Sequence, residues 1–214
     1  MRTMLRVLRP LCVLATLARP SLARAGVPSV NNSTAPACIS LVGSTGGVPA
    51  ATDGDFMVVV RDLASHPWAG ASVVIDLSGA VDLFICAEQL DPAATVNCGA
   101  KTVRKFTAAD GSVHFTLLGG SNGAGHAITL LNGGRIYMNG VLLNLPTVSA
   151  FDLDGSSGIG ANDLSAWLGD FGSGQNYGRS DYDCSGRLGA NDLSLWLSAF
   201  GSGRMVESCT SQCP

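Results

Sequence analysis

The sequence has 214 residues, of which 46% are hydrophobic and 14% charged, and its formal net charge is −3. This length suffices for one ordinary domain and a smaller second one. The acidic balance argues against nucleic acid and against an anionic membrane surface as partners.

The N-terminal segment 1–25 has the three regions of a secretory signal peptide. Its beginning carries Arg2, Arg6 and Arg9, Leu11–Leu17 is apolar, and Ala23-Arg24-Ala25 has the small-x-small pattern of a cleavage site. The apolar run is far shorter than the roughly 18 residues that span a bilayer. We therefore expect a cleaved signal at 1–25 and a secreted or cell-surface protein with no transmembrane segment. Cleavage removes five arginines and no acid, which leaves 8 basic and 16 acidic residues and a net charge of −8.

A flexible lead-in, 26–36, is followed by a β pattern over 37–148. Short apolar and β-branched runs alternate there with turn signals such as Asp53-Gly54 and Asp110-Gly111. This spacing is typical of an all-β sandwich. The predicted strands are Ile39–Val42, Phe56–Val60, Ala71–Leu77, Leu83–Cys86, Thr102–Phe106, Val113–Leu118, Ala127–Leu131, Arg135–Met138 and Val141–Leu145.

Two neighbouring segments in this region carry a resemblance. Phe56–Asp62 is a strand pattern that ends in Arg-Asp, and Pro67–Ile75 begins with Pro-Trp-Ala-Gly-Ala and continues as a strand pattern. They resemble the bacterial immunoglobulin-like domains of surface and secreted proteins, although Trp68 departs from the Pro-Val form of that turn. The resemblance implies an Ig-like β-sandwich over 37–148.

Six cysteines follow the signal segment. An even number of cysteines in an exported chain is typical of disulfides rather than of zinc ligands. Six cysteines allow 15 pairings. We favour Cys86–Cys98, which closes a short loop. In the tail 205–214, Cys209 and Cys213 pair with each other, or one of the two pairs with Cys184.

An internal repeat begins after Phe151. The segment 152–174 reads DLDGSSGIGANDLSAWLGDFGSG, and the segment 181–203 reads DYDCSGRLGANDLSLWLSAFGSG, so the two align without a gap. A calcium loop of EF-hand type places oxygen ligands at positions 1, 3, 5, 7 and 12. The residues at these positions are Asp152, Asp154, Ser156, Gly158 (through its carbonyl) and Asp163, then Asp181, Asp183, Ser185, Arg187 (through its carbonyl) and Asp192.

The ligand types of the repeat favour calcium. Three carboxylates in so short a loop repel one another, and a divalent cation removes that repulsion. Oxygen-only ligands, with no histidine or paired thiol, suit calcium rather than zinc. The sequence therefore predicts two calcium ions.

A helix is expected after each loop. Leu164, Trp167, Leu168 and Phe171 follow the i, i+3, i+4, i+7 spacing, and the second repeat has the same residue types at the aligned positions. We expect the two apolar stripes to pack against each other. The tryptophans are interpreted as core residues, rather than as a sugar-stacking platform.

The repeat resembles the type I dockerin family, on Asp-x-Asp-x-Ser, the aliphatic residue at position 8 and Asp-Leu at positions 12 and 13. The resemblance implies a small α-helical domain at 149–204 with two F-hand calcium loop-helix repeats. It also implies a bacterial protein that docks to a cohesin-like or other secreted partner, with a link to polysaccharide breakdown. The family's partner contacts correspond to Ala161-Asn162 and Ala190-Asn191. Loop 1 has Ser157 where EF-hand loops need glycine, so we expect loop 2 to bind calcium more tightly.

The sequence does not indicate an enzyme. It has no Gly-x-Ser-x-Gly, His-Glu-x-x-His or phosphate-loop motif, and its glutamates are only Glu88 and Glu207. The predicted function is therefore non-catalytic calcium-dependent docking or extracellular assembly. The alternative is a carbohydrate-binding β-sandwich with a calcium-stabilised tail.

Overall fold

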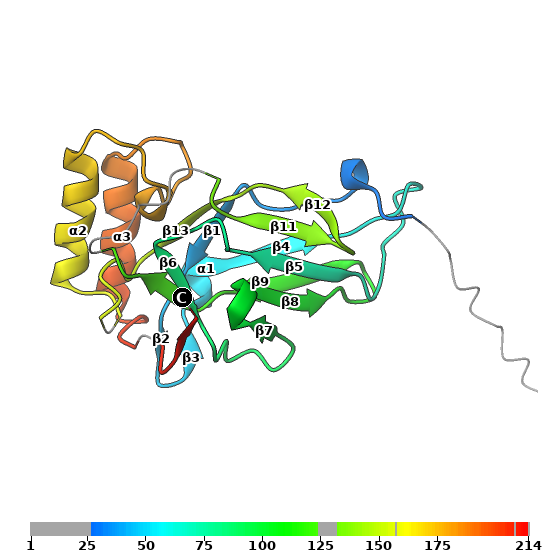
Figure 1. Ribbon diagram of the computed structural model, residues 1–214, viewed down its shortest axis with the longest axis horizontal. Helices are drawn as coiled ribbons and strands as arrows, with labels where there is room; N and C mark the ends of the chain where they lie inside the picture. The colour runs from blue at the N-terminus through cyan, green and yellow to red at the C-terminus, as the bar shows by residue number, and fades with distance from the viewer. Residues whose placement is uncertain (1–26, 124–131, 157, 208, 214) are drawn as a thin grey trace, which may run out of the picture.

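The computed structural model describes residues 27–123, 132–156, 158–207 and 209–213. The expected signal peptide, the predicted strand Ala127–Leu131 and Ser157 lie outside these ranges. Most of the described chain forms short β-strands, and two helices that run side by side cover one end of them (Figure 1).

The largest sheet has five antiparallel strands in the order β12-β11-β5-β8-β7. Its central strand β5 alternates buried and half-buried residues, because successive side chains of a strand point to opposite faces. Its strands are β5 (Ser72–Asp76), β7 (Thr95–Asn97), β8 (Thr102–Phe106), β11 (Arg135–Met138) and β12 (Val141–Asn144).

The other described strands form smaller sheets. β1 (Cys38–Leu41) pairs in parallel with β13 (Thr147–Ala150), and β4 (Asp55–Val59) pairs antiparallel with β9 (Ser112–Thr116). A three-stranded sheet has the order β10-β6-β14, and β2 pairs with β3. Their bounds are β2 Ser44–Thr45, β3 Val48–Pro49, β6 Leu83–Cys86, β10 Gly119–Ser121 and β14 Gln212–Cys213.

Helical segments are few and mostly short in the described part of the chain. The main helices are α2 (Ala161–Gly172) and α3 (Ala190–Ser202), which coincide with the expected repeat. The remaining ones are α1 Ala51–Gly54 and the 3-10 turns η1 Val30–Asn32, η2 Cys98–Ala100 and η3 Gly178–Ser180.

The predicted fold class is wrong in both of its parts. The strands do not form the two facing antiparallel sheets of an Ig-like sandwich, because they divide among small sheets and β1–β13 is parallel. The helices do not form a separate two-helix dockerin-like domain either. Trp167 and Trp196 share one apolar cluster with Val42 and Leu118 of the β region, so α2 and α3 need the β region to bury their apolar side chains.

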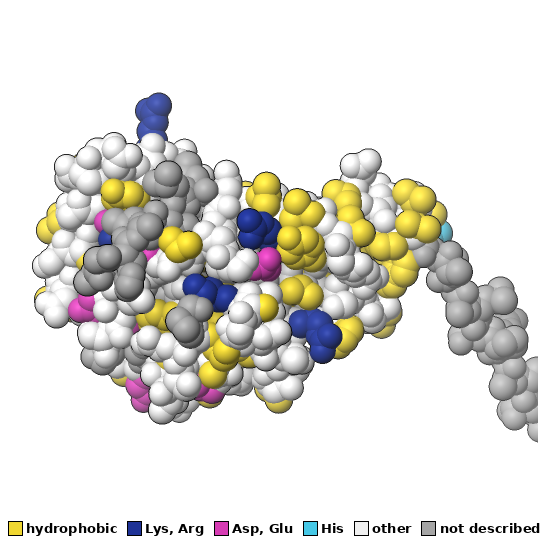
Figure 2. Space-filling model, viewed as in Figure 1, with side chains coloured by type: hydrophobic (Ala, Val, Ile, Leu, Met, Phe, Trp, Pro, Cys, Tyr) yellow, Lys and Arg dark blue, Asp and Glu magenta, His cyan; other side chains and the backbone are white. Residues whose placement is uncertain are grey.

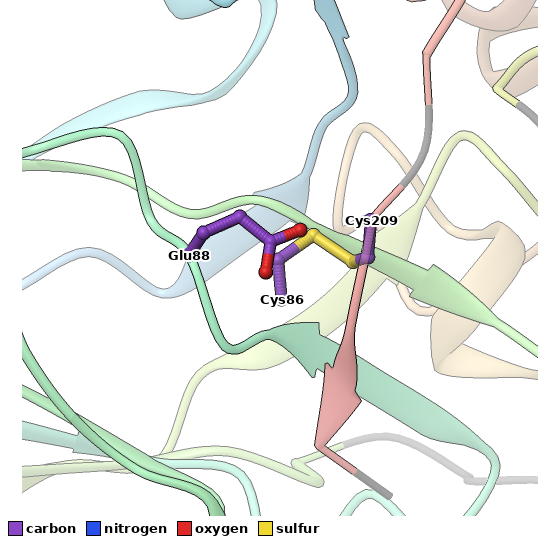
Figure 3. Close-up of side chains that lie close together, drawn as sticks. All are labelled: Cys86, Glu88 and Cys209. Carbon is purple, nitrogen blue, oxygen red and sulfur yellow. A yellow bond between two sulfur atoms is a disulfide. The ribbon is translucent and has the colours of Figure 1, made fainter.

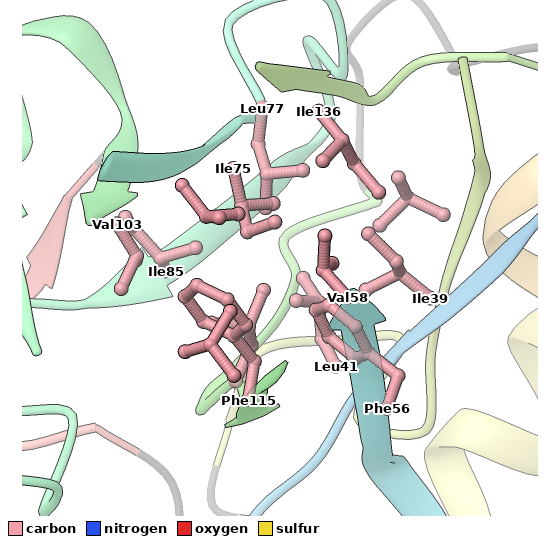
Figure 4. Packing of buried hydrophobic residues seen from close by; sticks show 14 of the residues in the cluster. Ile39, Leu41, Phe56, Val58, Ile75, Leu77, Ile85, Val103, Phe115 and Ile136 are labelled. Carbon is pink, nitrogen blue, oxygen red and sulfur yellow. The ribbon is translucent and has the colours of Figure 1, made fainter. Parts of the chain in front are cut away.

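A second apolar cluster fills the interior of the β region (Figure 4). It joins β1, β4, β5, β6 and β9, and Phe56 stacks on Phe115 at 5.4 Å between ring centroids. Leu41, Ile75 and Ile136 are fully buried in it. This cluster makes the β region a firm support for the helices at its end.

Three disulfides tie the β region to the C-terminal part of the chain. They are Cys38–Cys184, Cys86–Cys209 and Cys98–Cys213. The expected Cys86–Cys98 pair is wrong: Cys86 bonds to Cys209, and Cys98 bonds to Cys213 of β14, the strand that pairs with β6. The alternatives for the tail are wrong as well, because Cys209 and Cys213 bond to Cys86 and Cys98 and Cys184 bonds to Cys38.

Candidate metal centres

The structure brings the three aspartates of each repeat together. Ligand atoms of Asp152, Asp154 and Asp163 all lie within 4.8 Å of one another, and the same holds for Asp181, Asp183 and Asp192. Acidic side chains are visible at this helix-bearing end of the molecule (Figure 2). Each predicted carboxylate set is therefore a compact cluster.

The other predicted ligands line the same two hollows. The first hollow is bordered by Asp154, Ser156, Gly158 and Asp163, and the second by Asp183, Ser185, Arg187 and Asp192. In the second loop the Ser185 hydroxyl lies 3.0 Å from the Arg187 carbonyl oxygen, so two predicted ligand atoms are neighbours.

Backbone N–H groups hold the carboxylates in place. Asp163 accepts hydrogen bonds from the Leu153 and Asp154 amides on Oδ1 and from the Gly160 amide on Oδ2. Asp192 accepts from the equivalent Asp183 and Gly189 amides. Since these aspartates stand at the third position of α2 and α3, each of them also caps its helix. Helix and loop are thus coupled through one side chain.

The two loops differ at the glycine that makes their sharp turn. In loop 2 the Gly186 amide donates to Oδ2 of Asp181, at 3.0 Å. In loop 1 the donor to Oδ2 of Asp152 is the Gly158 amide, one position later and at 3.3 Å. Gly186 has a φ of +78° and Gly158 a φ of +85°, a conformation that residues with a Cβ rarely adopt. The shift reflects the expected displacement of glycine in loop 1.

Burial and neighbouring like charges raise the pKa of the first aspartate in each cluster. Burial, with a further contribution from Asp163, raises the pKa of Asp152 from 3.8 to about 7. Burial, with a further contribution from Asp192, raises the pKa of Asp181 to about 6. A group held as an anion in such a place destabilises the fold unless a cation neutralises it. Both clusters therefore favour a bound cation.

The apolar stripes expected on the helices are only half buried. Trp167 and Trp196 are buried, which confirms them as core residues. Leu168 and Phe171 are each 51% exposed, and the equivalent Leu197 and Phe200 are 47% and 48% exposed. The expected packing of two whole stripes on each other is therefore wrong. The tryptophans pack inward on the β region, whereas Phe171 and Phe200 each stack on the tryptophan of their own helix and remain about half exposed.

Sequence reasoning missed the ion pair that joins the two repeats. Arg179 donates two hydrogen bonds to Asp170 of α2, at 2.8 and 2.7 Å, and both side chains are only 4% exposed. Ser180 also donates to Asp170, and the Trp167 indole donates to the Ser180 carbonyl. These bonds place Asp181, the first residue of loop 2. In the sequence, the signal for this pair is the arginine at Arg179, just before the second repeat.

No family model matches the chain, and no curated protein or solved structure matches it.

Proposed function

We propose that this chain is an exported, non-catalytic calcium-binding protein in which two metal loops hold α2 and α3 in place as a docking surface for another exported protein. The observation that supports it best is the recurrence of one aspartate triad in both halves of the repeat, with the same spacing and with Asp163 and Asp192 accepting equivalent hydrogen bonds from the Gly160 and Gly189 amides.

The donor set favours calcium among the common metals. Each hollow offers carboxylate, hydroxyl and carbonyl oxygens, and calcium takes six to eight oxygen ligands in flexible geometry. Neutralisation of Asp152 and Asp181 by the ion would remove the free-energy cost of their burial. Asp163 and Asp192 would link metal binding to the stability of the helices, because each belongs to both a loop and the first turn of a helix.

The outward helix faces support the docking role. Leu168 and Phe171 on α2 and Leu197 and Phe200 on α3 occupy equivalent positions of the repeat and leave apolar surface in water. Ala161-Asn162 and Ala190-Asn191, the partner-contacting positions implied by the dockerin resemblance, are exposed as well. The dockerin resemblance supports only the docking role here, because α2 and α3 do not form a separate domain.

The disulfides of the chain support export from the cell. Three disulfides persist in oxidising compartments, and among the described residues no helix is long and apolar enough to cross a membrane. The carbohydrate-binding alternative has less support: Phe56, Phe84 and Phe115 are buried, which removes half of the six aromatic candidates of the β region for a sugar platform.

Calorimetric titration of the purified protein with calcium tests the metal sites. We expect two sites, the tighter one in loop 2, and the loss of one site each in Asp154→Asn and Asp183→Asn. Asp110→Asn, which alters an exposed turn aspartate of the β region, serves as the matched control. Absence of heat, together with a melting temperature unchanged by calcium, would refute the proposal.

The docking surface has its own test. A Phe171→Ala/Phe200→Ala variant should keep its calcium titration and lose calcium-dependent retention of a secreted partner from the medium of the source organism. Val141→Ala is the control, because Val141 is exposed to the same degree on β12. Equal retention by both variants would place docking elsewhere.

A further inference from the structure

A cavity of about 310 Å³ lies between the β region and the C-terminal segment, apart from the two metal hollows. Its walls come from the chain around β2, the end of β6, the start of β10 and the residues that follow α3. The lining residues are Val42, Gly43, Ser44, Gly47, Cys86, Glu88, Leu90, Leu118, Gly119, Asp152, Glu207 and Thr210.

The cavity combines an apolar floor with acidic walls. Val42 and Leu118 are buried side chains of the apolar cluster that also contains Trp167 and Trp196. Both glutamates of the whole chain line the cavity, although they lie far apart in the sequence. Among its described lining residues there is no lysine, arginine or histidine. The lining side chains therefore carry negative charge, with no cationic side chain among those described.

Hydrogen bonds from backbone amides and hydroxyl groups favour the ionised form of both glutamates. The amides of Gly46 and Gly47, in the turn between β2 and β3, lower the pKa of Glu207. Partial burial opposes ionisation of Glu88, but hydrogen bonds from Thr210 and Ser211 outweigh it and lower the pKa of that carboxyl. Hydrogen bonds to the charged form of an acid stabilise that form.

The walls are rigidly held. The Cys86–Cys209 disulfide lies beside the Glu88 carboxylate and fastens the C-terminal segment to the end of β6 (Figure 3). Gly43 and Glu207 approach so closely that a Cβ at Gly43 would lie 2.8 Å from the Glu207 carbonyl oxygen. A ligand would thus meet a preformed site, which reduces the ordering cost of binding.

We propose that this cavity binds a small organic cation, an ammonium group on an apolar body. The ammonium group pairs with Glu88 and Glu207, and the apolar body contacts Val42, Leu90 and Leu118. The volume is at the lower end of the range for small-molecule sites, about 300–1,000 Å³. An anion would be repelled, and a neutral ligand would desolvate the carboxylates without pairing them. The proposal does not depend on the docking role.

Calorimetry with three probes of one length, hexylammonium, hexanol and hexanoate, tests this inference. Calcium is kept saturating, since Asp152 belongs to both the cavity lining and loop 1. We expect hexylammonium to bind, hexanol to bind at least about tenfold more weakly and hexanoate not to bind. Glu88→Gln and Glu207→Gln keep an acceptor oxygen and should each lower hexylammonium affinity about tenfold, whereas Asp110→Asn should not.

Amide chemical shifts of the unaltered protein locate the probe without any variant. Hexylammonium should shift the amide signals of Gly47, Leu90 and Thr210, and the shifts should saturate with the calorimetric affinity. Hexanol binding as tight as hexylammonium, shifts confined to other regions, or no binding of any probe would overturn the proposal.

Discussion

Asp152→Asn should change protein stability in opposite directions with and without calcium. Asp152 is 4% exposed, and the pKa of its carboxyl in the metal-free fold is about 7 against 3.8 ordinarily. Because the folded-state pKa is raised, the protonated carboxyl stabilises the fold relative to the ionised one. This stabilisation is complete below about pH 4 and is lost as the pH rises through about 7. At about pH 8 the buried anion costs roughly 4 kcal/mol, since each tenfold change in acidity between the unfolded and folded states corresponds to about 1.4 kcal/mol.

Asparagine removes that charge at a smaller cost. Asp152 accepts hydrogen bonds from the Gly155 and Gly158 amides, one on each oxygen, and asparagine retains one acceptor oxygen. Loss of the other hydrogen bond costs about 1–2 kcal/mol. In chelator at about pH 8 the variant should therefore be more stable than the unaltered protein by roughly 2 kcal/mol. In saturating calcium it should be less stable, because it has lost a ligand and with it the binding energy that adds to stability.

Urea unfolding followed by tryptophan fluorescence measures both effects, since Trp167 and Trp196 are buried next to the loops. Asp110→Asn is the control, because its carboxyl is exposed and its pKa is lowered by hydrogen bonds from Ser112. Equal destabilisation of Asp152→Asn in chelator and in calcium would show that the carboxylate is a structural hydrogen-bond acceptor, and the reasoning from buried charge would be refuted.

Three further outcomes are expected. Cys184 lies inside loop 2 and is bonded to Cys38, so a Cys38→Ser/Cys184→Ser variant should weaken calcium binding at loop 2 and leave loop 1 unchanged in calorimetry, whereas equal weakening would contradict a local effect. Arg179→Ala leaves Asp170 buried without its guanidinium partner and should lower the free energy of unfolding by about 3–5 kcal/mol in urea titrations; a loss near zero would mean that water replaces the guanidinium. Trp167→Ala should cost about 3–5 kcal/mol, and Phe171→Ala, half exposed on the same helix, clearly less, so similar melting temperatures for the two variants would contradict the observed orientation of α2.

Local features of this protein could be read from its sequence. The spacing of Asp152, Asp154 and Asp163, which recurs in the second half of the repeat, predicts a loop followed by a helix, and the structure forms both loops and helices there. Most of the predicted strands also form. These features depend on residues that are close in the chain, so hydrophobic periodicity and turn residues predict them without knowledge of long-range contacts.

Long-range features were decided by tertiary packing alone. β14 adds to β6 and so sets the pairings of Cys86 and Cys98, which no spacing of cysteines specifies. The helices bury their tryptophans on the β region and leave Phe171 and Phe200 about half exposed. Which helix face is buried depends on where the β region offers apolar surface, and the sequence of the helix does not specify this. Glu88 and Glu207 line one cavity for the same reason. Contacts between distant segments depend on how the whole chain packs, and a periodic sequence pattern does not specify which segment it will pack against.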